Sequence, residues 1–219
     1  IKSDNDTEEG RGFIEIASGR VNVTSGGDAL TAQRSIDIRG GDIKLVSGGG
    51  SGSSSSIDIS AKGIKGLESV VISAGNIEID SADDGVHSDN AIFVSGGSCL
   101  IASGDDAFHA EETLEISGGV INITKSYEGL ESKLITIDDG TIHIVSSDDG
   151  INVAGGDGSG GWTPGGGGSS AAYILTINGG LVWMNAGGDG LDSNGNMVIN
   201  GGTVLVNGPT DNGNGPIDI

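Results

Sequence analysis

Short runs in which Ile, Val or Leu alternates with a polar residue follow one another along nearly the whole chain of 219 residues. Alternation with a period of two predicts strands with one buried face, and the glycines between the runs predict turns. No convincing amphipathic helix interrupts the pattern. The sequence therefore predicts an all-β protein.

The strand runs recur with a period of about 22 residues, and two markers share that period. One marker is an acidic position after each pair of strands, and the other is a glycine turn between two strands. We expect about eight repeats, which begin near residues 13, 35, 69, 91, 113, 135, 174 and 197. Two longer steps between markers predict inserted Gly/Ser-rich loops at residues 47–56 and 155–172.

A unit of this length cannot bury its apolar face alone, so the repeats must stack. Stacking places like residues in inward columns. One predicted column contains Ile16, Ile38, Ile72, Val94, Ile116, Ile137, Ile177 and Ile199, and another contains Val21, Ile43, Ile77, Ile121, Ile142, Val182 and Val204. This pattern is typical of a parallel β-helix with about three short strands per coil, here one domain over residues 1–219. A β-propeller is disfavoured, because its blades usually need about 40 residues.

The charge balance restricts the possible partners. The chain has 31 Asp and Glu against 10 Lys and Arg, which disfavours nucleic acid and anionic membrane surfaces and permits cations. No apolar run approaches membrane-spanning length, so we expect no membrane insertion. The single Cys99 excludes an internal disulfide, and its apolar neighbours indicate a buried thiol. The opening "IKSDNDTEEG" does not resemble a signal peptide, as in a mature or trimmed product.

Rows of polar residues are predicted outside the turn before each third strand. The first row contains Asp83, Asp105, Tyr127 and Asp148; the second contains Asp84, Asp106, Glu128, Asp149, Asp189 and Asp211; the third contains His87, His109, Glu131, Asn152, Asp192 and Asn214. Unit charges stacked at ~5 Å repel by about 3 kcal/mol at an effective dielectric of 20. A cation between them reverses the sign.

Calcium suits such rows, because its oxygen ligands at about 2.3–2.6 Å allow one ion between carboxylates of adjacent coils. The expected metal ligands are Asp83, Asp84, Asp105, Asp106, Glu128, Glu131, Asp148, Asp149, Asp189 and Asp192. Magnesium fits less well, since it prefers tight octahedral geometry with retained water. The alternative is that the rows are solvated charge that keeps an open-ended β-stack soluble.

His87 and His109 are expected to stack one coil apart beside the aspartates. A zinc pair is conceivable but disfavoured, because no cysteine or clear third histidine joins them and His143 lies in another column. Hydrogen bonds that orient the carboxylates, or contact with a ligand, are the preferred roles, and Asn152 continues the same row.

Outward aromatic residues are few, so each is a candidate for ligand binding. Trp183 shares an outward column with His143 and Leu205, Trp162 lies in the second inserted loop, and Tyr127 replaces an acid in the first row. Exposed rings on a flat β-face suit stacking against the C–H faces of sugars. Packing of loops or of the end of the stack is an equally good explanation for each ring.

The stretches "SGDDAFHA" (103–110), "TKSYEGLES" (124–132) and "SSDDGIN" (146–152) resemble a bacterial carbohydrate-binding family, most densely over residues 69–154. The resemblance implies a calcium-containing right-handed parallel β-helix, similar in fold to pectate lyases, that binds cellulose and acidic sugars such as polygalacturonate. It also implies an extracellular or cell-surface setting. The chain departs from the pattern at Lys62 and Lys65, so we expect no calcium at that level.

Three functions remain open. The favoured one is calcium-dependent, non-catalytic binding of plant cell-wall polysaccharide. A polysaccharide lyase would need calcium and a basic residue to remove a proton, and Lys125 and Lys133 are the basic residues near the central acidic rows. Both lysines are isolated, which favours a solvated or salt-bridged role. The third possibility is a structural or adhesive β-solenoid.

Overall fold

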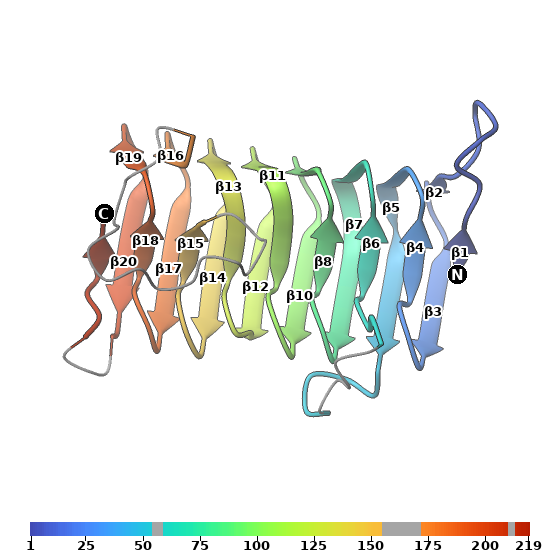
Figure 1. The fold of residues 1–219 in the computed structure, drawn as a ribbon, viewed down its shortest axis with the longest axis horizontal. Helices are drawn as coiled ribbons and strands as arrows, with labels where there is room; N and C mark the ends of the chain where they lie inside the picture. The colour runs from blue at the N-terminus through green and yellow to red at the C-terminus, as the bar shows by residue number, and fades with distance from the viewer. Residues whose placement is uncertain (54–58, 155–171, 210–212) are drawn as a thin grey trace.

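The computed structural model describes residues 1–53, 59–154, 172–209 and 213–219, and no helix in these segments could span a membrane. Strands from successive repeats pair in parallel, as predicted. Figure 1 shows them side by side along one long axis, with the two termini at opposite ends. The all-β prediction and the long parallel sheet are thus confirmed, in agreement with a β-helix. The handedness and the number of coils stay predictions.

One stack of strands faces the viewer in Figure 1 and is continuous along the axis. It contains β3 (Arg20–Ser25), β5 (Ser35–Ser47), β7 (Ser69–Ser81), β10 (Ser98–Ser103), β12 (Val120–Lys125), β14 (Thr141–Ser146), β17 (Leu181–Ala186) and β20 (Thr203–Asn207). Each of these strands pairs with the next in the order given. We call the outer side of this stack the flat face.

Two further stacks complete the fold. One contains β2 (Ile14–Ile16), the first part of β5 and β7, β9 (Ala91–Val94), the second part of β11 (Phe108–Ile116) and of β13 (Leu130–Ile137), β16 (Ile174–Ile177) and β19 (Asn196–Ile199). The other contains β1 (Lys2–Ser3), β4 (Leu30–Ala32), β6 (Ile64–Gly66), β8 (Val86–Ser88), the first part of β11 and β13, β15 (Ile151–Val153), β18 (Leu191–Ser193) and β21 (Ile217–Asp218).

The predicted inward columns are the core of the molecule. In the first column Ile38 pairs with Ile72, and Ile116 pairs with Ile137. These four side chains are fully buried. In the second column Cys99 fills the place between Ile77 and Ile121, and its thiol is buried as expected. Burial of each such aliphatic side chain contributes about 1.5–3 kcal/mol, so the columns hold successive repeats together.

The column prediction weakens at the C-terminal end. Ile199 pairs with Ile177 in the predicted register, but its side chain is 47% exposed. Val204 at the end of the second column is only half-buried. No described strand packs beyond β19 and β20 in these two stacks, so the last residues of each column lack a covering neighbour.

The glycine turns have a steric origin. Gly41 has a φ of +101°, in the left-handed region that side chains rarely adopt. A Cβ atom at this position would also lie 2.9 Å from the carbonyl oxygen of Gly19 in the preceding repeat. Glycine is therefore required both by the backbone angle and by the close approach of the next turn.

The two longer steps in the repeat are present in the register. The amide of Lys62 donates to the side chain of Asp28, 34 residues earlier, and the amide of Asp189 donates to Asp149, 40 residues earlier. The predicted loop at residues 155–172 lies, except for Ala172, outside the described residues. Of the loop at residues 47–56, the structure describes residues 47–53.

Candidate metal and ligand sites

Acidic residues from successive repeats stack directly before the strands of the third stack. The amide of Gly85 donates to the carbonyl of Asp106, and the amide of Gly129 donates to the carbonyl of Asp149. We call this row the acidic ladder; its described members are Asp84, Asp106, Glu128, Asp149 and Asp189.

The register predicted for the C-terminal end of the ladder is wrong. Asp192 pairs with Asp218, not with Asn214, and the amide of Gly190 donates to the carbonyl of Gly215 at 3.1 Å. Gly215 therefore takes the place expected for Asp211, which lies outside the described residues. The connection before the last strand is longer than the repeat predicts, and this shifts the final register.

The ladder carboxylates hold the backbone of the next repeat. The amide of Asp106 donates to Oδ1 of Asp84 at 3.2 Å, and the amide of Glu128 donates to Oδ1 of Asp106 at 3.1 Å. The amide of Asp189 donates to Oδ1 of Asp149 at 2.7 Å. A bond from a backbone amide to a charged carboxylate is stronger than one between neutral groups. The sequence analysis did not predict these amide–carboxylate hydrogen bonds. The only sequence signal for them was an acidic residue directly before Gly or Ala at the start of each strand.

Lys62 caps the N-terminal end of the ladder, as its departure from the acidic pattern indicated. Its Nζ donates to Oδ1 of Asp83 at 3.0 Å and to Oδ2 of Asp84 at 2.5 Å. Burial would lower the pKa of Lys62, but the charges of Asp84 and Asp83 outweigh burial and raise it. Burial would raise the pKa of Asp84, but its hydrogen bond with His87 and the charge of Lys62 keep it below the ordinary value. Lys65 lies beside His87 in the register.

His87 and His109 stack one repeat apart, with ring centroids 5.0 Å apart. Nδ1 of His87 lies 2.8 Å from Oδ2 of Asp84. Nδ1 of His109 lies 3.2 Å from Oδ2 of Asp106 and 3.1 Å from Oε2 of Glu131. Burial would lower the pKa of His109, but Asp106 and the surrounding carboxylates raise it to about 9. The expected histidine–carboxylate contacts are present, while contact with a ligand stays a prediction.

Two glutamates follow in the next repeat. Asn152 donates from Nδ2 to Oε1 of Glu128 at 2.8 Å, whereas Oε2 of Glu128 and Oδ1 of Asn152 are buried with no hydrogen-bond partner in the described part of the chain. Burial and the charge of Asp106 raise the pKa of Glu128 to about 9. Burial and the interaction with Asp106 raise the pKa of Glu131 to about 8.

Four groups of these residues bring potential ligand atoms within 4.8 Å of one another: Asp84, His87 and His109; Asp106, His109 and Glu131; Asp83, Asp84 and Asp105; and Asp149, Asp189 and Asp192. The second is called the histidine cluster and the last the aspartate cluster. In the aspartate cluster burial raises the pKa of Asp149 to about 7 and that of Asp192 to about 6.

The first predicted row is also stacked. The amide of Tyr127 donates to the carbonyl of Asp105, and the amide of Asp148 donates to the carbonyl of Tyr127. The Tyr127 side chain is 48% exposed, and its hydrogen bond with Asp148 raises the pKa of the phenol to about 12. Burial and the charge of Asp106 raise the pKa of Asp105 to about 6.

A row of apolar and aromatic side chains lies on the flat face. It contains Leu100, Asn122, His143, Trp183 and Leu205, in the register predicted, and we call it the ring row. The rings of His143 and Trp183 are stacked, with centroids 4.0 Å apart and planes at 11°. Nδ1 of His143 lies 2.9 Å from Oδ1 of Asn122, which fixes the ring orientation. Trp162, the other predicted ring, lies outside the described residues.

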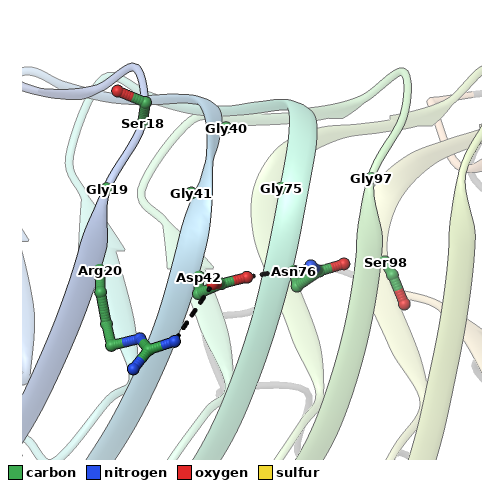
Figure 2. A pocket seen from close by; sticks show the side chains of 10 residues that line it. All are labelled: Ser18, Gly19, Arg20, Gly40, Gly41, Asp42, Gly75, Asn76, Gly97 and Ser98. Carbon is green, nitrogen blue, oxygen red and sulfur yellow. Dashed lines mark hydrogen bonds and ion pairs between the residues drawn. The ribbon is translucent and has the colours of Figure 1, made fainter.

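Shallow cavities extend the flat face toward the N-terminus. One, of about 770 Å³, lies over the glycine turns and is lined by Ser18, Gly19, Arg20, Gly40, Gly41, Asp42, Gly75, Asn76, Gly97 and Ser98 (Figure 2). Arg20 lies 3.8 Å from Asp42, which also accepts a hydrogen bond from Asn76 at 3.1 Å. A second cavity, of about 330 Å³, continues to Lys44, Glu78 and Leu100. Sequence reasoning did not single out these residues; the row of side-chain-free turns was the available signal.

The two lysines considered as bases both have acceptors. Nζ of Lys133 donates to Glu112 at 2.6 Å, and this hydrogen bond raises the pKa of Lys133. Nζ of Lys125 donates to the carbonyl of Ser51.

Comparison with known proteins gives two matches. The chain is similar in structure to a polysaccharide lyase-like protein from C. thermocellum, solved as a gadolinium derivative, with 18% identity and a TM-score of 0.42; the match covers 93% of this chain and 90% of that one. No curated protein matches the chain. Residues 1–107 match the family described as "Carbohydrate-binding domain-containing protein", and this range shares residues 69–107 with the region of densest predicted resemblance, 69–154. The resemblance predicted from the motifs is thus confirmed over residues 1–107, which are similar to a carbohydrate-binding domain family.

Proposed function

We propose that the protein binds plant cell-wall polysaccharide without catalysis, outside the bacterial cell or on its surface, and that calcium is needed for the acidic part of this binding. The observation that carries the proposal is the aspartate cluster, in which Asp149, Asp189 and Asp192 bring three carboxylates together. All three offer oxygen ligands, which calcium prefers. A calcium ion held here would neutralise the cluster and could also take a carboxylate of an acidic polymer such as polygalacturonate.

Calcium is favoured at this cluster over the N-terminal end of the ladder. At that end the ammonium group of Lys62 already neutralises Asp83 and Asp84. In the described part of the chain, no lysine or arginine forms an ion pair with the aspartate cluster. The carboxylates of the aspartate cluster therefore lack the compensating ammonium group that the N-terminal end of the ladder has. A divalent ion is expected to stabilise the aspartate cluster more than that end.

The flat face supplies a second surface, suited to a neutral polymer such as cellulose. The half-buried rings of His143 and Trp183 stack on each other on this face, with exposed Leu205 and Leu181 beside Trp183. Neighbouring strands lie ~4.8 Å apart, close to the length of one hexose unit, so a glycan along the axis could meet one strand per sugar. Toward the N-terminus, Asn76 and Lys44 provide hydrogen-bonding groups on the same face.

The alternative lyase function receives no support from the lysine contacts. A base must accept a proton, but Lys133 is held by Glu112 and its pKa is raised, so it stays charged. We therefore keep the lyase, and the purely structural solenoid, as outcomes of the test.

The test is a pull-down of the full chain on insoluble cellulose and on polygalacturonate, with calcium or with a chelator. We expect cellulose binding in both conditions, and polygalacturonate binding only when calcium is present. Trp183→Ala should lose cellulose binding, and Trp183→Phe, which keeps a ring, should retain most of it. Asp192→Asn should weaken polygalacturonate binding, while Asp138→Asn, the same change at an exposed residue of another corner, should not. Formation of unsaturated product would overturn the binding function in favour of a lyase, and no retention on either polymer would leave the solenoid.

A further inference from the structure

The histidine cluster differs chemically from the aspartate cluster. Asp106 precedes β11, His109 lies in β11, and Glu131 lies next to His109 in β13. One imidazole nitrogen and two carboxylate oxygens therefore meet at a junction between two consecutive repeats. The side chains of Asp106, His109 and Glu131 are largely buried.

The donor distances fit a small transition-metal ion. Zinc takes nitrogen and oxygen ligands at about 2.0–2.2 Å, so two ligands of one ion lie ~3.0 Å apart at a right angle and ~3.4 Å apart at the tetrahedral angle. Nδ1 of His109 lies 3.2 Å from Oδ2 of Asp106 and 3.1 Å from Oε2 of Glu131. Both separations lie between these limits, and the three ligand atoms all lie within 4.8 Å of one another, so one ion could join them.

The single proton of His109 Nδ1 can be donated to only one of the carboxylates around it. Nδ1 of His109 carries at most one proton, yet two carboxylate oxygens lie at nearly equal distances from it, and Oδ2 of Asp84 lies 3.9 Å away. A hydrogen bond between Glu131 and Asp106 joins the two carboxyl groups in the metal-free state, and a metal ion could take both carboxylates and the nitrogen at once.

A second, independent observation points to a missing ligand. Glu128 is buried, with 8% of its surface exposed, and its Oε2 has no hydrogen-bond partner among the described residues. The charges of Asp106 and Glu131 act on this carboxyl group, so it lies beside the histidine cluster. Oδ1 of Asn152, one strand further along the row of Glu131, is also buried without a partner. Unpartnered buried oxygens are costly, and coordination would satisfy them.

We propose that Asp106, His109 and Glu131 bind a divalent transition-metal ion of the zinc type, which links two consecutive repeats and is separate from calcium in the aspartate cluster. The ligand chemistry sets the class of metal: calcium takes oxygen ligands, whereas imidazole suits zinc and its neighbours. Glu128 or Asn152 can supply a further oxygen. This inference does not rest on the proposed function.

The test uses the full, tag-free chain, stripped of metal and titrated with Zn²⁺ in excess Ca²⁺ by calorimetry. A parallel titration with Co²⁺ is followed by visible absorption, which reports its coordination. We expect one zinc ion to bind and to raise the melting temperature. His109→Gln should weaken zinc binding by roughly tenfold or more and abolish the cobalt spectrum. His87→Gln, the matched change one repeat away, should leave both intact.

Three results would overturn the inference: no zinc binding by the native chain in excess calcium, unchanged binding by His109→Gln, or equal losses in the two histidine variants. Glu131→Gln, which should also weaken binding, provides a second variant if His109→Gln does not fold. Asp192→Asn separates the two proposals, because it should reduce the calcium response and leave zinc binding unchanged. Failure of zinc binding with a normal calcium response would sink this inference alone.

Discussion

Calcium should stabilise the protein more at pH 8 than at pH 5, because the aspartate cluster binds protons in the metal-free state. The pKa of Asp149 is raised from 3.8 to about 7, mainly by burial. Between these two values the native state binds more protons than the unfolded state. The free energy of unfolding of the metal-free protein must therefore fall as the pH rises through this window.

The size of this effect follows from the pKa of Asp149. A shift of about three units, at 1.36 kcal/mol each, corresponds to at most about 4 kcal/mol. The Asp149 carboxylate is only partly buried, so solvent screening leaves roughly 1–2 kcal/mol. For a chain of this length, such a loss lowers the melting temperature by about 2–8 °C. The proposed calcium ion is expected to remove this loss by compensating the ionised carboxylates.

The assay is scanning calorimetry at pH 5 to 8, with calcium or with a chelator, on the native chain and on Asp149→Asn. The asparagine can still accept the amide hydrogen bond of Asp189 but does not titrate. We expect the melting temperature of the native chain without calcium to fall with pH more steeply than that of the variant. An equal slope in the two proteins, or a calcium effect that is larger at pH 5 than at pH 8, would refute the reasoning.

Three further changes test the packing. Lys62→Met should lower the free energy of unfolding by about 3–5 kcal/mol because it leaves the buried charge of Asp84 without its cation, and Asp84→Asn in the same chain should recover part of the loss; denaturant titration measures both. Ile116→Ala should lower it by about 2–5 kcal/mol in the same assay, since it opens a cavity in a fully buried column. Gly41→Ala, at a φ of +101°, should lower the melting temperature, whereas Gly26→Ala, which has open space and no such angle, should change it little.

The stacking of the repeats could be predicted from the sequence because it depends on residue type at a fixed period. Ile38, Ile72 and Ile116 occupy equivalent places, and any parallel stack of the repeats brings them into one column. The last repeat shows the limit of this reasoning. Asp211 carries the acidic marker at the right spacing, yet the strand that pairs with Asp192 begins later, at Ile217. From the sequence alone, an acidic residue that has the right spacing but does not occupy a ladder position cannot be distinguished from one that does.

The side-chain partners could not be predicted, because they depend on distances between repeats. The sequence indicated that Lys62 interrupts the acidic ladder, but not that its ammonium group contacts both Asp83 and Asp84. It placed His109 beside the aspartates, but the equal approach of Asp106 and Glu131 is visible in three dimensions alone.

The hydrogen bonds of the ladder explain why it consists of acids although the charges repel. Oδ1 of Asp84 accepts the amide of the next repeat, while Oδ2 contacts Lys62 and His87. In the same way, Oδ1 of Asp106 accepts an amide and Oδ2 contacts His109. The first oxygen joins the repeats, and the second faces a cation or a histidine.

At another corner of the fold, asparagine side chains form hydrogen bonds between successive repeats where no cation is involved. There Asn200 donates to Asn178, and Asn178 donates to Asp138, each at 2.7 Å. An asparagine in the acidic ladder could still accept the backbone amide through its oxygen, but its NH₂ group would meet the cation side as a second donor. Backbone bonding alone therefore does not require aspartate. Aspartate is required because its second oxygen, Oδ2, faces a cation or a histidine. Metal ions or charged ligands are therefore to be sought on the side of the ladder that the Oδ2 atoms face.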